Sequence, residues 1–466
     1  MRTLLKLVGI RRTCVRSLTA SWGNKGLFTP GSPLGHTQKA GGECRGSQGR
    51  CCTTSAESRT DPSMLRHLTS KITATGPITV AEYMREVLTN PVSGYYVKND
   101  MLGADGDFIT SPEISQIFGE LVGIWCVSEW MAAGKPRAFQ LVELGPGRGS
   151  LTSDILRAFH QLQSVLNEAE VSVHLVEVSP KLSQVQAECL SGEHTRVSSS
   201  EDEAVYRSGT TNTGLTISWY RTVEDVPRGF SIFLAHEFFD ALPIHKFQRT
   251  DKGWREVMVD IDPEDPEKLR FVVFPAPTLA STALVHADEK REHVEVCPEG
   301  GVIIQKLANR VAKDGGAALI ADYGHDGTKT DTFRGFRGHK LHDVLLAPGT
   351  ADLTADVDFS YLKRTAGEEV VCLGPIPQRE FLKNMGIDTR LQVLLRNCQD
   401  ASVRAQLIQS YDMLTNPERM GHRFQFFSLL SPSRLAEPQD DGEGLRKRKK
   451  GRAPLPVAGF TPLRYP

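Results

Sequence analysis

The residues with the clearest chemical potential form the run ELGPGRG at positions 143–149. A short apolar stretch, 139–144, precedes this run, and a helical pattern over 151–166 follows it. Glycines permit tight turns and close approach of a ligand, because a Cβ atom would clash there. Open α/β sheets bind ligands just beyond the carboxyl ends of their strands. The pattern therefore predicts a ligand-binding loop between a strand and a helix.

The glycine spacing indicates which ligand this loop binds. A dinucleotide fingerprint needs a third glycine at position 150, which is Ser150 in this sequence. The observed pattern is GxGxG, with an acid two residues before its first glycine, which is typical of S-adenosylmethionine sites. We predict that Gly145, Gly147 and Gly149 approach the carboxypropyl and sulfonium part, and that Glu143 helps to hold the amino group. A glycine turn without a ligand is the alternative.

Glu177 stands near the end of a second predicted strand, 171–178. An acid at this place can accept hydrogen bonds from both ribose hydroxyls, so Glu177 is predicted to bind the cofactor. It follows Gly145 by 32 residues, whereas the dinucleotide version usually has about 20. A longer intervening helix would account for this. The alternative is an exposed glutamate at a strand end.

Glu237 and Asp240 lie in the segment AHEFFDALP, 235–243, after a fourth predicted strand. They are three residues apart, so on a helical turn they share a face. Two carboxylates on one face could bind a guanidinium through parallel charge-assisted hydrogen bonds, and both are predicted to be catalytic. Helix capping explains the same acids without chemistry. His236 is expected to be packed or hydrogen-bonded rather than to act as a base.

Two further acidic segments fall near predicted strand ends or helix starts. The tripeptide Asp322-Tyr323-Gly324 could line an acceptor pocket or simply form the turn. The segment DLTADVDF, 352–359, is interpreted first as helix capping, with a role in the site as the alternative.

Apolar strands alternating with helices predict a parallel α/β sheet with helices on both faces. After a helical segment at 62–135, the core is predicted at 136–435, with a hairpin-rich insert at about 244–300. Thr110 to Glu113 form a capping box with Pro112 in the first turn, which predicts a helix over 112–131. The predicted strands are 139–144, 171–178, 215–219, 231–235, 317–321, 369–373 and 424–430.

Composition narrows the class of protein. The chain has 466 residues, of which 39% are hydrophobic and 24% charged, so a mostly disordered protein is excluded. No apolar run reaches the length of about 18 residues that a membrane span needs, so no stable membrane insertion is expected. The nine cysteines are too few for a disulfide scaffold and lack zinc-site spacing, so no metal site is predicted.

The formal net charge of −1 conceals an uneven distribution. Residues 1–56 carry nine basic side chains and one acid, Glu43, which leaves 46 basic and 55 acidic groups in the other 410 residues. An Arg-rich, acid-poor start with apolar residues predicts a mitochondrial transit peptide, with a disordered basic tail as the alternative. Residues 436–466 are basic and Pro-rich and are expected to be disordered. The charge balance suggests no nucleic-acid partner.

Five motifs together resemble the MidA-like family of class I, seven-strand methyltransferases. They occur in the family's order over about residues 62–435: GDFITSPEIS (106–115), ELGPGRG (143–149), AHEFFDALP (235–243), ADYGHDGTKTDTFRG (321–335) and DLTADVDF (352–359). The resemblance is strongest to the branch of mitochondrial complex I assembly factors that act as protein arginine methyltransferases. It implies S-adenosylmethionine as cofactor, symmetric dimethylation of an arginine on the 49-kDa subunit of complex I, a matrix location and a role in assembly.

Three functions remain open from the sequence. The first is a protein arginine methyltransferase, and the second is a nucleotide-binding oxidoreductase, which Ser150 disfavours. The third is a non-catalytic assembly chaperone that retains the cofactor pocket. The first and third share every motif, although intact acids at 143, 177, 237 and 240 favour activity. The target arginine, the oligomeric state, the leader cleavage site and the role of the insert are not predicted.

Overall fold

The computed structural model of the chain describes residues 62–98, 110–192, 195–198, 203–435 and 456–462. The predicted transit peptide and the start of the 106–115 motif lie outside these ranges. No helix within them is long and apolar enough to cross a membrane.

The central sheet confirms the predicted class of fold. Its seven core strands lie in the order β6-β3-β2-β7-β12-β18-β17. The first five of these run parallel, and β18 runs antiparallel to both of its neighbours. Numbered along the chain, the order is 3-2-1-4-5-7-6, the topology of a class I methyltransferase sheet. The strands are β2 (Ala138–Leu144), β3 (Glu170–Val176), β6 (Thr216–Tyr220), β7 (Ser231–His236), β12 (Gly316–His325), β17 (Val371–Pro377) and β18 (Phe424–Leu430).

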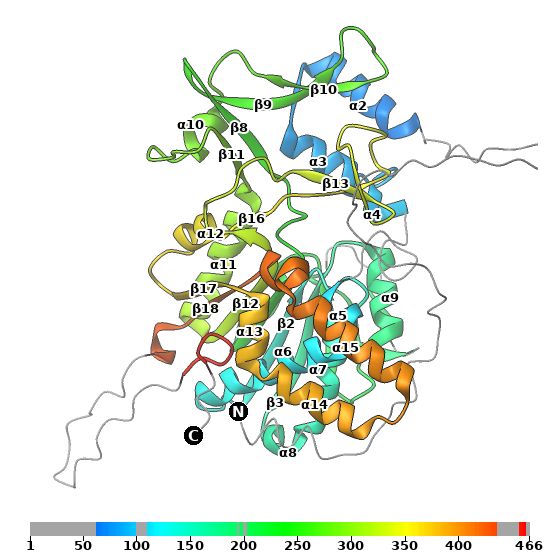
Figure 1. The fold of residues 1–466 in the computed structure, drawn as a ribbon, viewed down its shortest axis with the longest axis vertical. Helices are drawn as coiled ribbons and strands as arrows, with labels where there is room; N and C mark the ends of the chain where they lie inside the picture. The colour runs from blue at the N-terminus through cyan, green and yellow to red at the C-terminus, as the bar shows by residue number, and fades with distance from the viewer. Residues whose placement is uncertain (1–61, 99–109, 193–194, 199–202, 436–455, 463–466) are drawn as a thin grey trace, which may run out of the picture. The chain divides into compact units, whose positions relative to one another are not determined.

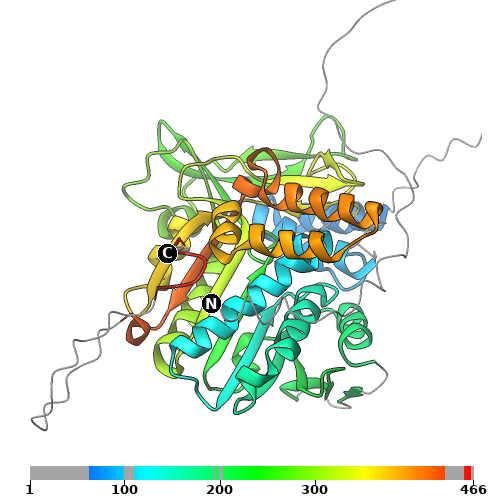
Figure 2. The ribbon, with the colours of Figure 1, turned by 60° about the horizontal axis from the view of Figure 1, so that its bottom comes forward.

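Alternating side chains of the central strands enter two separate cores, one on each face of the sheet. On one face Leu141 and Leu234 pack with helices α6 (Gln116–Ala132) and α7 (Ser150–Gln161). On the other, Val142 and Phe233 pack with α11 (Pro298–Asp314) and α12 (Phe359–Ala366). Every residue of β7 is buried, as expected for a strand that helices cover on both sides. In Figure 2, α6 and α7 (cyan) and the orange helices α13 (Gln378–Met385) and α14 (Ile387–Asn397) lie over the same face.

Helix α6 carries two acids into the core on its buried surface. Glu120 and Glu129 are each 3% exposed. Glu120 accepts hydrogen bonds from Arg390, and Glu129 accepts them from Arg434, 2.8 Å from the Nε atom. The single helix expected over 112–131 is instead two helices, because Ser115 is extended (φ −159°) between α5 (Ser111–Ile114) and α6. The predicted capping box is present at the start of α5.

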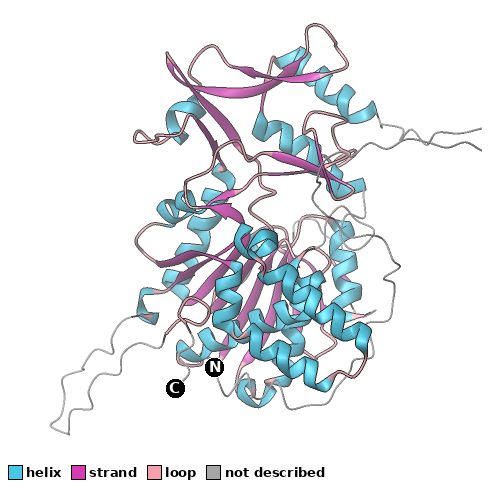
Figure 3. Cartoon of the chain, in the orientation of Figure 1, coloured by secondary structure: helices cyan, strands magenta, loops and turns pink. Residues whose placement is uncertain are grey.

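The insert forms a second sheet, which the N-terminal helices cover. Its strands are β8 (His245–Thr250), β9 (Gly253–Ile261), β10 (Leu269–Val273) and β11 (His293–Val296), and β1 (Ile78–Thr79) pairs with β9. Helices α2 (Pro62–Thr75) and α3 (Val80–Thr89) lie beside this sheet (Figures 1 and 3). Their apolar side chains form a common core with those of the sheet. Within the predicted helical segment 62–135, α6 packs on the central sheet. Amphipathic α3 packs its buried face, including Tyr83 and Met84, against the insert.

Two other features differ from the sequence-based expectation. A small sheet of β13 (Arg334–Arg337), β14 (Lys340–His342) and β15 (Asp352–Thr354) follows β12. Residues 456–462 lie in the tail expected to be disordered, but they pack on α13. There Val457 is 4% exposed and the Phe460 ring contacts the Phe381 ring edge-on. These apolar side chains explain the ordering of this part of the tail.

Candidate functional site

The predicted ligand loop is a tight turn between β2 and α7. Gly145, Gly147 and Gly149 have φ values of 62°, 54° and 83°, a backbone region that favours glycine. The Gly149 N–H donates to the Pro146 carbonyl at 2.7 Å, and the Gly145 N–H donates to the Val176 carbonyl on β3 at 3.0 Å. The loop is therefore fixed to two strand ends at the carboxyl edge of the sheet, which is the location that the sequence predicted.

Glu143 is a residue of β2, and its side chain contacts Thr152 in the first turn of α7. It is 3% exposed and accepts hydrogen bonds from the hydroxyl and the backbone N–H of Thr152. Burial raises the pKa of the Glu143 carboxyl to about 7, although the Thr152 hydrogen bonds oppose this rise. A nearby cation would favour the ionised form, so the group is suited to an ammonium ligand. Its contact with the cofactor amino group stays a prediction.

Glu177 lies at the end of β3 and is buried rather than exposed. Its Oε1 accepts from the Ser179 N–H at 2.7 Å, and its Oε2 accepts from Gln186 Nε2 at 3.0 Å. Burial raises the pKa of the Glu177 carboxyl, whereas these hydrogen bonds lower it. The alternative of an exposed strand-end glutamate is wrong, since Glu177 is 7% exposed. Its predicted hydrogen bonds to a ribose stay a prediction.

Gln186 connects the two predicted cofactor elements, and sequence reasoning did not identify it. Its Nε2 donates to the Gly147 carbonyl at 2.7 Å as well as to Glu177, and its Oε1 accepts from Trp219 Nε1 at 2.9 Å. The side chain is completely buried on α9 (Pro180–Ser191). A polar residue on the inner face of a helix was the only signal available, and it does not specify these partners.

We expect Gln186→Ala to weaken S-adenosylmethionine binding about tenfold, because it leaves buried polar partners unpaired at a cost of roughly 1–3 kcal/mol. Isothermal titration calorimetry would measure the dissociation constant. Gln184→Ala is the matched control, since Gln184 is an exposed glutamine of the same helix that bonds Glu188. Equal dissociation constants for the two variants would contradict the role of Gln186.

Gly145 also makes room for a side chain of the neighbouring loop. A Cβ atom built on Gly145 would lie 2.7 Å from Cδ2 of Phe238, closer than real contacts allow. Phe238 lies against Gly145 in the direction that a Cβ would occupy, and the approach of Gly145 to the cofactor stays a prediction. Because Phe238 follows Glu237, the glycine loop and the acidic loop are packed directly on each other.

Glu237 and Asp240 lie in the turn that follows β7, and a third acid, Asp322 of β12, holds this turn. The Asp322 carboxylate accepts the backbone N–H groups of Phe238, Phe239 and Asp240 at 3.1, 2.9 and 3.3 Å. Glu237 adopts φ 48°, a conformation that costs a non-glycine residue about 1–2 kcal/mol. No helix begins between β7 and β8, so the helix-capping alternative for Glu237 and Asp240 is wrong. Asp322 accepts the N–H of Asp240, whereas the Glu237 N–H donates to the Ala321 carbonyl at 3.0 Å.

The surroundings raise the pKa of all three carboxyl groups. Burial raises the pKa of the Glu237, Asp240 and Asp322 carboxyl groups. Repulsion from Asp240 raises the pKa further at Glu237 and at Asp322, whereas a hydrogen bond from Thr354 (2.7 Å) and the charge of Arg334 lower it at Asp240. Oε1 of Glu237 is buried and has no hydrogen-bond partner among the residues that the structure describes. Such a cluster favours the binding of a cation.

His236 is packed, as predicted, but no side-chain hydrogen bond to a described residue holds it. Its ring stacks on Phe424 at 6.1 Å and meets Phe118 edge-on at 5.1 Å. Its Nε2 lies 3.6 Å from Glu237 Oε1 and, within the described ranges, makes no hydrogen bond. Burial lowers the pKa of His236 to about 3, so the ring is neutral near pH 7.

The 352–359 motif contributes to the site and also caps a helix. The Asp352 carboxylate accepts from the Tyr96 hydroxyl at 2.9 Å. Asp356 is paired with Lys329 at 2.7 Å and with Arg334 at 2.6 Å, and these cations lower its pKa. Asp358 is the N-cap of α12, as predicted.

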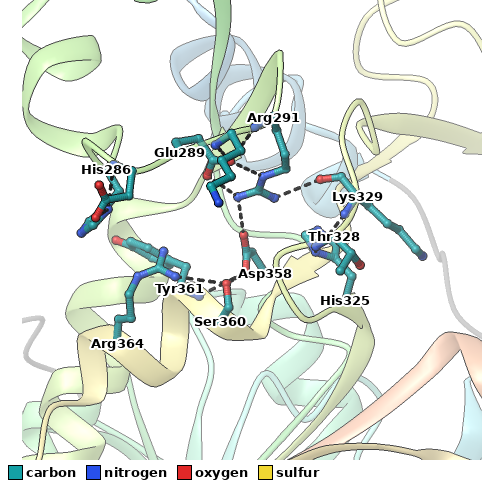
Figure 4. Close-up of polar contacts among 12 residues, drawn as sticks. His286, Glu289, Arg291, His325, Thr328, Lys329, Asp358, Ser360, Tyr361 and Arg364 are labelled. Carbon is teal, nitrogen blue, oxygen red and sulfur yellow. Dashed lines mark hydrogen bonds and ion pairs between the residues drawn. The ribbon is translucent and has the colours of Figure 1, made fainter.

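A polar network holds the 325–332 loop against the insert (Figure 4). Arg291 donates to the Asp358 carboxylate at 3.0 Å and to the Lys329 carbonyl at 3.0 Å, and Glu289 holds the Arg291 guanidinium with both oxygens. His325 Nδ1 accepts from the Thr328 N–H at 3.2 Å. The network therefore places Lys329 beside Asp356, at the margin of the acidic cluster.

The sheet order, the glycine loop and the acid at the next strand end define a class I S-adenosylmethionine-dependent methyltransferase. Residues 121–376 match the family described as S-adenosyl-L-methionine-dependent methyltransferase, Methyltransf_28. The match spans more than half of the chain, and the chain belongs to this family. Its cofactor is S-adenosylmethionine, and the fixed loop and buried Glu177 fit that ligand.

The chain is also similar to several curated proteins named mitochondrial protein arginine methyltransferase NDUFAF7. It is 70% identical to the Danio rerio protein over 414 residues, which cover 89% of this chain and 95% of the relative. It is 63% identical to the Homo sapiens protein over 406 residues, which cover 86% of this chain and 90% of the relative. The Drosophila melanogaster homologue is 49% identical over 406 residues, which cover 86% of this chain and 89% of the homologue.

A solved structure has the same fold. It is a Burkholderia thailandensis protein bound to S-adenosylhomocysteine, with 23% sequence identity and a TM-score of 0.64 over 80% of this chain and 92% of that one. The family match excludes the oxidoreductase alternative that the glycine spacing leaves open.

Proposed function

We propose that this methyltransferase acts on arginine in a protein, and that Glu237 and Asp240 bind the acceptor guanidinium. The substrate would be the 49-kDa subunit of complex I, symmetrically dimethylated in the mitochondrial matrix during assembly of the complex. The names of the curated relatives, which are mitochondrial protein arginine methyltransferases, support the substrate class and the organelle. The motif resemblance supports the subunit, the matrix location and the assembly role.

One observation carries the proposal. Three carboxyl groups, those of Glu237, Asp240 and Asp322, converge where β7 and β12 end, and Phe238 places their loop against the predicted cofactor loop. A guanidinium stays charged at every relevant pH, since its pKa exceeds about 12, and it presents paired N–H donors to carboxylates. A bound guanidinium would offset the repulsion among these buried acids, so the cluster is suited to an arginine.

Methyl transfer to a guanidinium requires both orientation and charge stabilisation from these acids. S-adenosylmethionine supplies an activated methyl group for an in-line displacement. The acids must hold one guanidinium nitrogen in line for attack, and they must stabilise its charge as it loses planarity. The proton leaves more easily after transfer, so neither acid needs to act as a full base beforehand.

The test is methyl transfer by the purified protein to the recombinant 49-kDa subunit. After incubation with methyl-labelled S-adenosylmethionine, acid hydrolysis and chromatography would separate symmetric from asymmetric dimethylarginine. Labelled symmetric dimethylarginine is the expected product, and arginine-to-lysine variants of the subunit would identify the target. Binding of cofactor and subunit without transfer would favour the assembly-chaperone alternative.

We expect kcat/KM for an arginine substrate to fall on acidification at a pH above the usual carboxyl range of about 4. The acids must be ionised to bind the guanidinium, and burial raises the pKa of both Glu237 and Asp240. Activity is therefore gained as the pH rises through these raised values and lost as it falls through them. Initial rates at saturating cofactor would measure the profile, and a constant kcat/KM down to pH 5 would contradict the expectation.

A further inference from the structure

Asp322 is the most completely buried acid of the site. It has no exposed surface, so the side chain does not reach a bound substrate. Its Oδ2 accepts three successive backbone N–H groups, those of residues 238–240, and its Oδ1 accepts the N–H of Tyr323 at 2.9 Å. Four donors to one carboxylate are enough to fix its position.

These hydrogen bonds hold a backbone that would otherwise relax. Glu237 is a non-glycine residue with φ 48°, and the three N–H groups follow it directly in the chain. Such a conformation persists only where its surroundings over-determine it. The Glu237 N–H donates to the Ala321 carbonyl at 3.0 Å, so β12 holds the turn at both residue 321 and residue 322.

We propose that Asp322 is a positioning residue for methyl transfer, which acts by fixing the turn that carries Glu237 and Asp240. This role rests on the proposed function of those two acids. The Asp322 carboxylate bonds the backbone of residues 238–240, which connects the two acids, and it does not touch the substrate.

The charge of Asp322 also acts on the acids that it positions. Asp240 and Glu237 raise the pKa of Asp322, so by reciprocity Asp322 disfavours their ionisation. Other charged or titratable groups that face Glu237 and Asp240 lie on several elements: Tyr96, Glu113, His236, Tyr323, Arg334, Asp352 and Asp356. Removal of the Asp322 charge should therefore shift the acid limb of the pH profile, where kcat/KM falls on acidification, to lower pH.

The test compares Asp322→Ala and Asp322→Asn with the unmodified full-length protein on an arginine substrate that it methylates. Asp322→Ala removes the acceptor, so we expect kcat to fall about a hundredfold while KM for S-adenosylmethionine changes less than twofold. Asp322→Asn keeps one acceptor oxygen and removes the charge. It should retain more activity than the alanine variant, with its acid limb about one pH unit lower.

Glu129→Gln is the matched control for loss of a buried acid. Glu129 pairs with Arg434 away from the site, so this variant should lower the melting temperature without changing kcat or the pH profile. Asp322 variants that lose stability but keep the unmodified kcat and acid limb would overturn the positioning role. Absence of arginine methylation by the unmodified protein would overturn the proposed function and this role together.

Discussion

Glu237→Gln should lower kcat for arginine methylation about a hundred- to thousandfold, the usual effect of removing one preorganised electrostatic contact. The amide preserves the size of the side chain but removes the charge that would hold and stabilise the guanidinium. Cofactor affinity should be unchanged, because Glu237 belongs to the loop after β7, whereas the predicted cofactor contacts lie after β2 and β3. Single-turnover transfer and calorimetric binding of S-adenosylmethionine would measure the two effects separately.

Glu120→Gln is the control for this first prediction. Glu120 of α6 is also a buried glutamate, but it pairs with Arg390 of α14 and does not belong to the acidic cluster. It should reduce stability and leave transfer by the folded protein unchanged. A Glu237→Gln enzyme with normal kcat would refute the catalytic assignment.

Gly145→Ala should weaken S-adenosylmethionine binding about a hundredfold or more, equivalent to roughly 3 kcal/mol. Two effects add in this variant. Alanine is disfavoured at the φ of 62°, and the new Cβ atom would lie 2.7 Å from Phe238 Cδ2. The backbone or the ring must therefore shift, which displaces either the cofactor loop or the acidic turn.

Two further variants separate these effects. Gly214→Ala introduces alanine at a φ of 86° with no atom within 4 Å of the new Cβ, so it has the strain without the clash. It should leave binding unchanged. The double variant Gly145→Ala/Phe238→Ala removes the clash and should recover part of the lost affinity. A double variant that binds S-adenosylmethionine as weakly as Gly145→Ala would show that the contact with Phe238 is not the cause of the loss.

The central sheet could be predicted because its strands carry strong local patterns. The segment 424–430 matches β18 residue for residue, and the strand expected at 139–144 begins one residue earlier. The glycine loop was recognisable because its spacing is local too. Breaks at Ser115 and Leu162 were not predicted, since both lie within continuous helical patterns.

The support of the site could not be predicted in the same way. The three N–H donors of Asp322 lie 82 to 84 residues earlier in the chain, and no local pattern indicates such a pairing. Gln186 likewise meets Gly147 across 39 residues. Strand β1 has two residues and pairs with β9, far along the chain, so tertiary contact rather than propensity determines it.

The position of β18 has a consequence for how a growing chain completes its fold. This strand lies between β12 and β17, yet it is the last of the seven to be synthesised. Until it emerges from the ribosome, β12 presents an unpaired edge to other chains, and such edges promote aggregation. The domain therefore cannot complete its sheet during synthesis of its first 420 residues, and the closing step joins segments about a hundred residues apart.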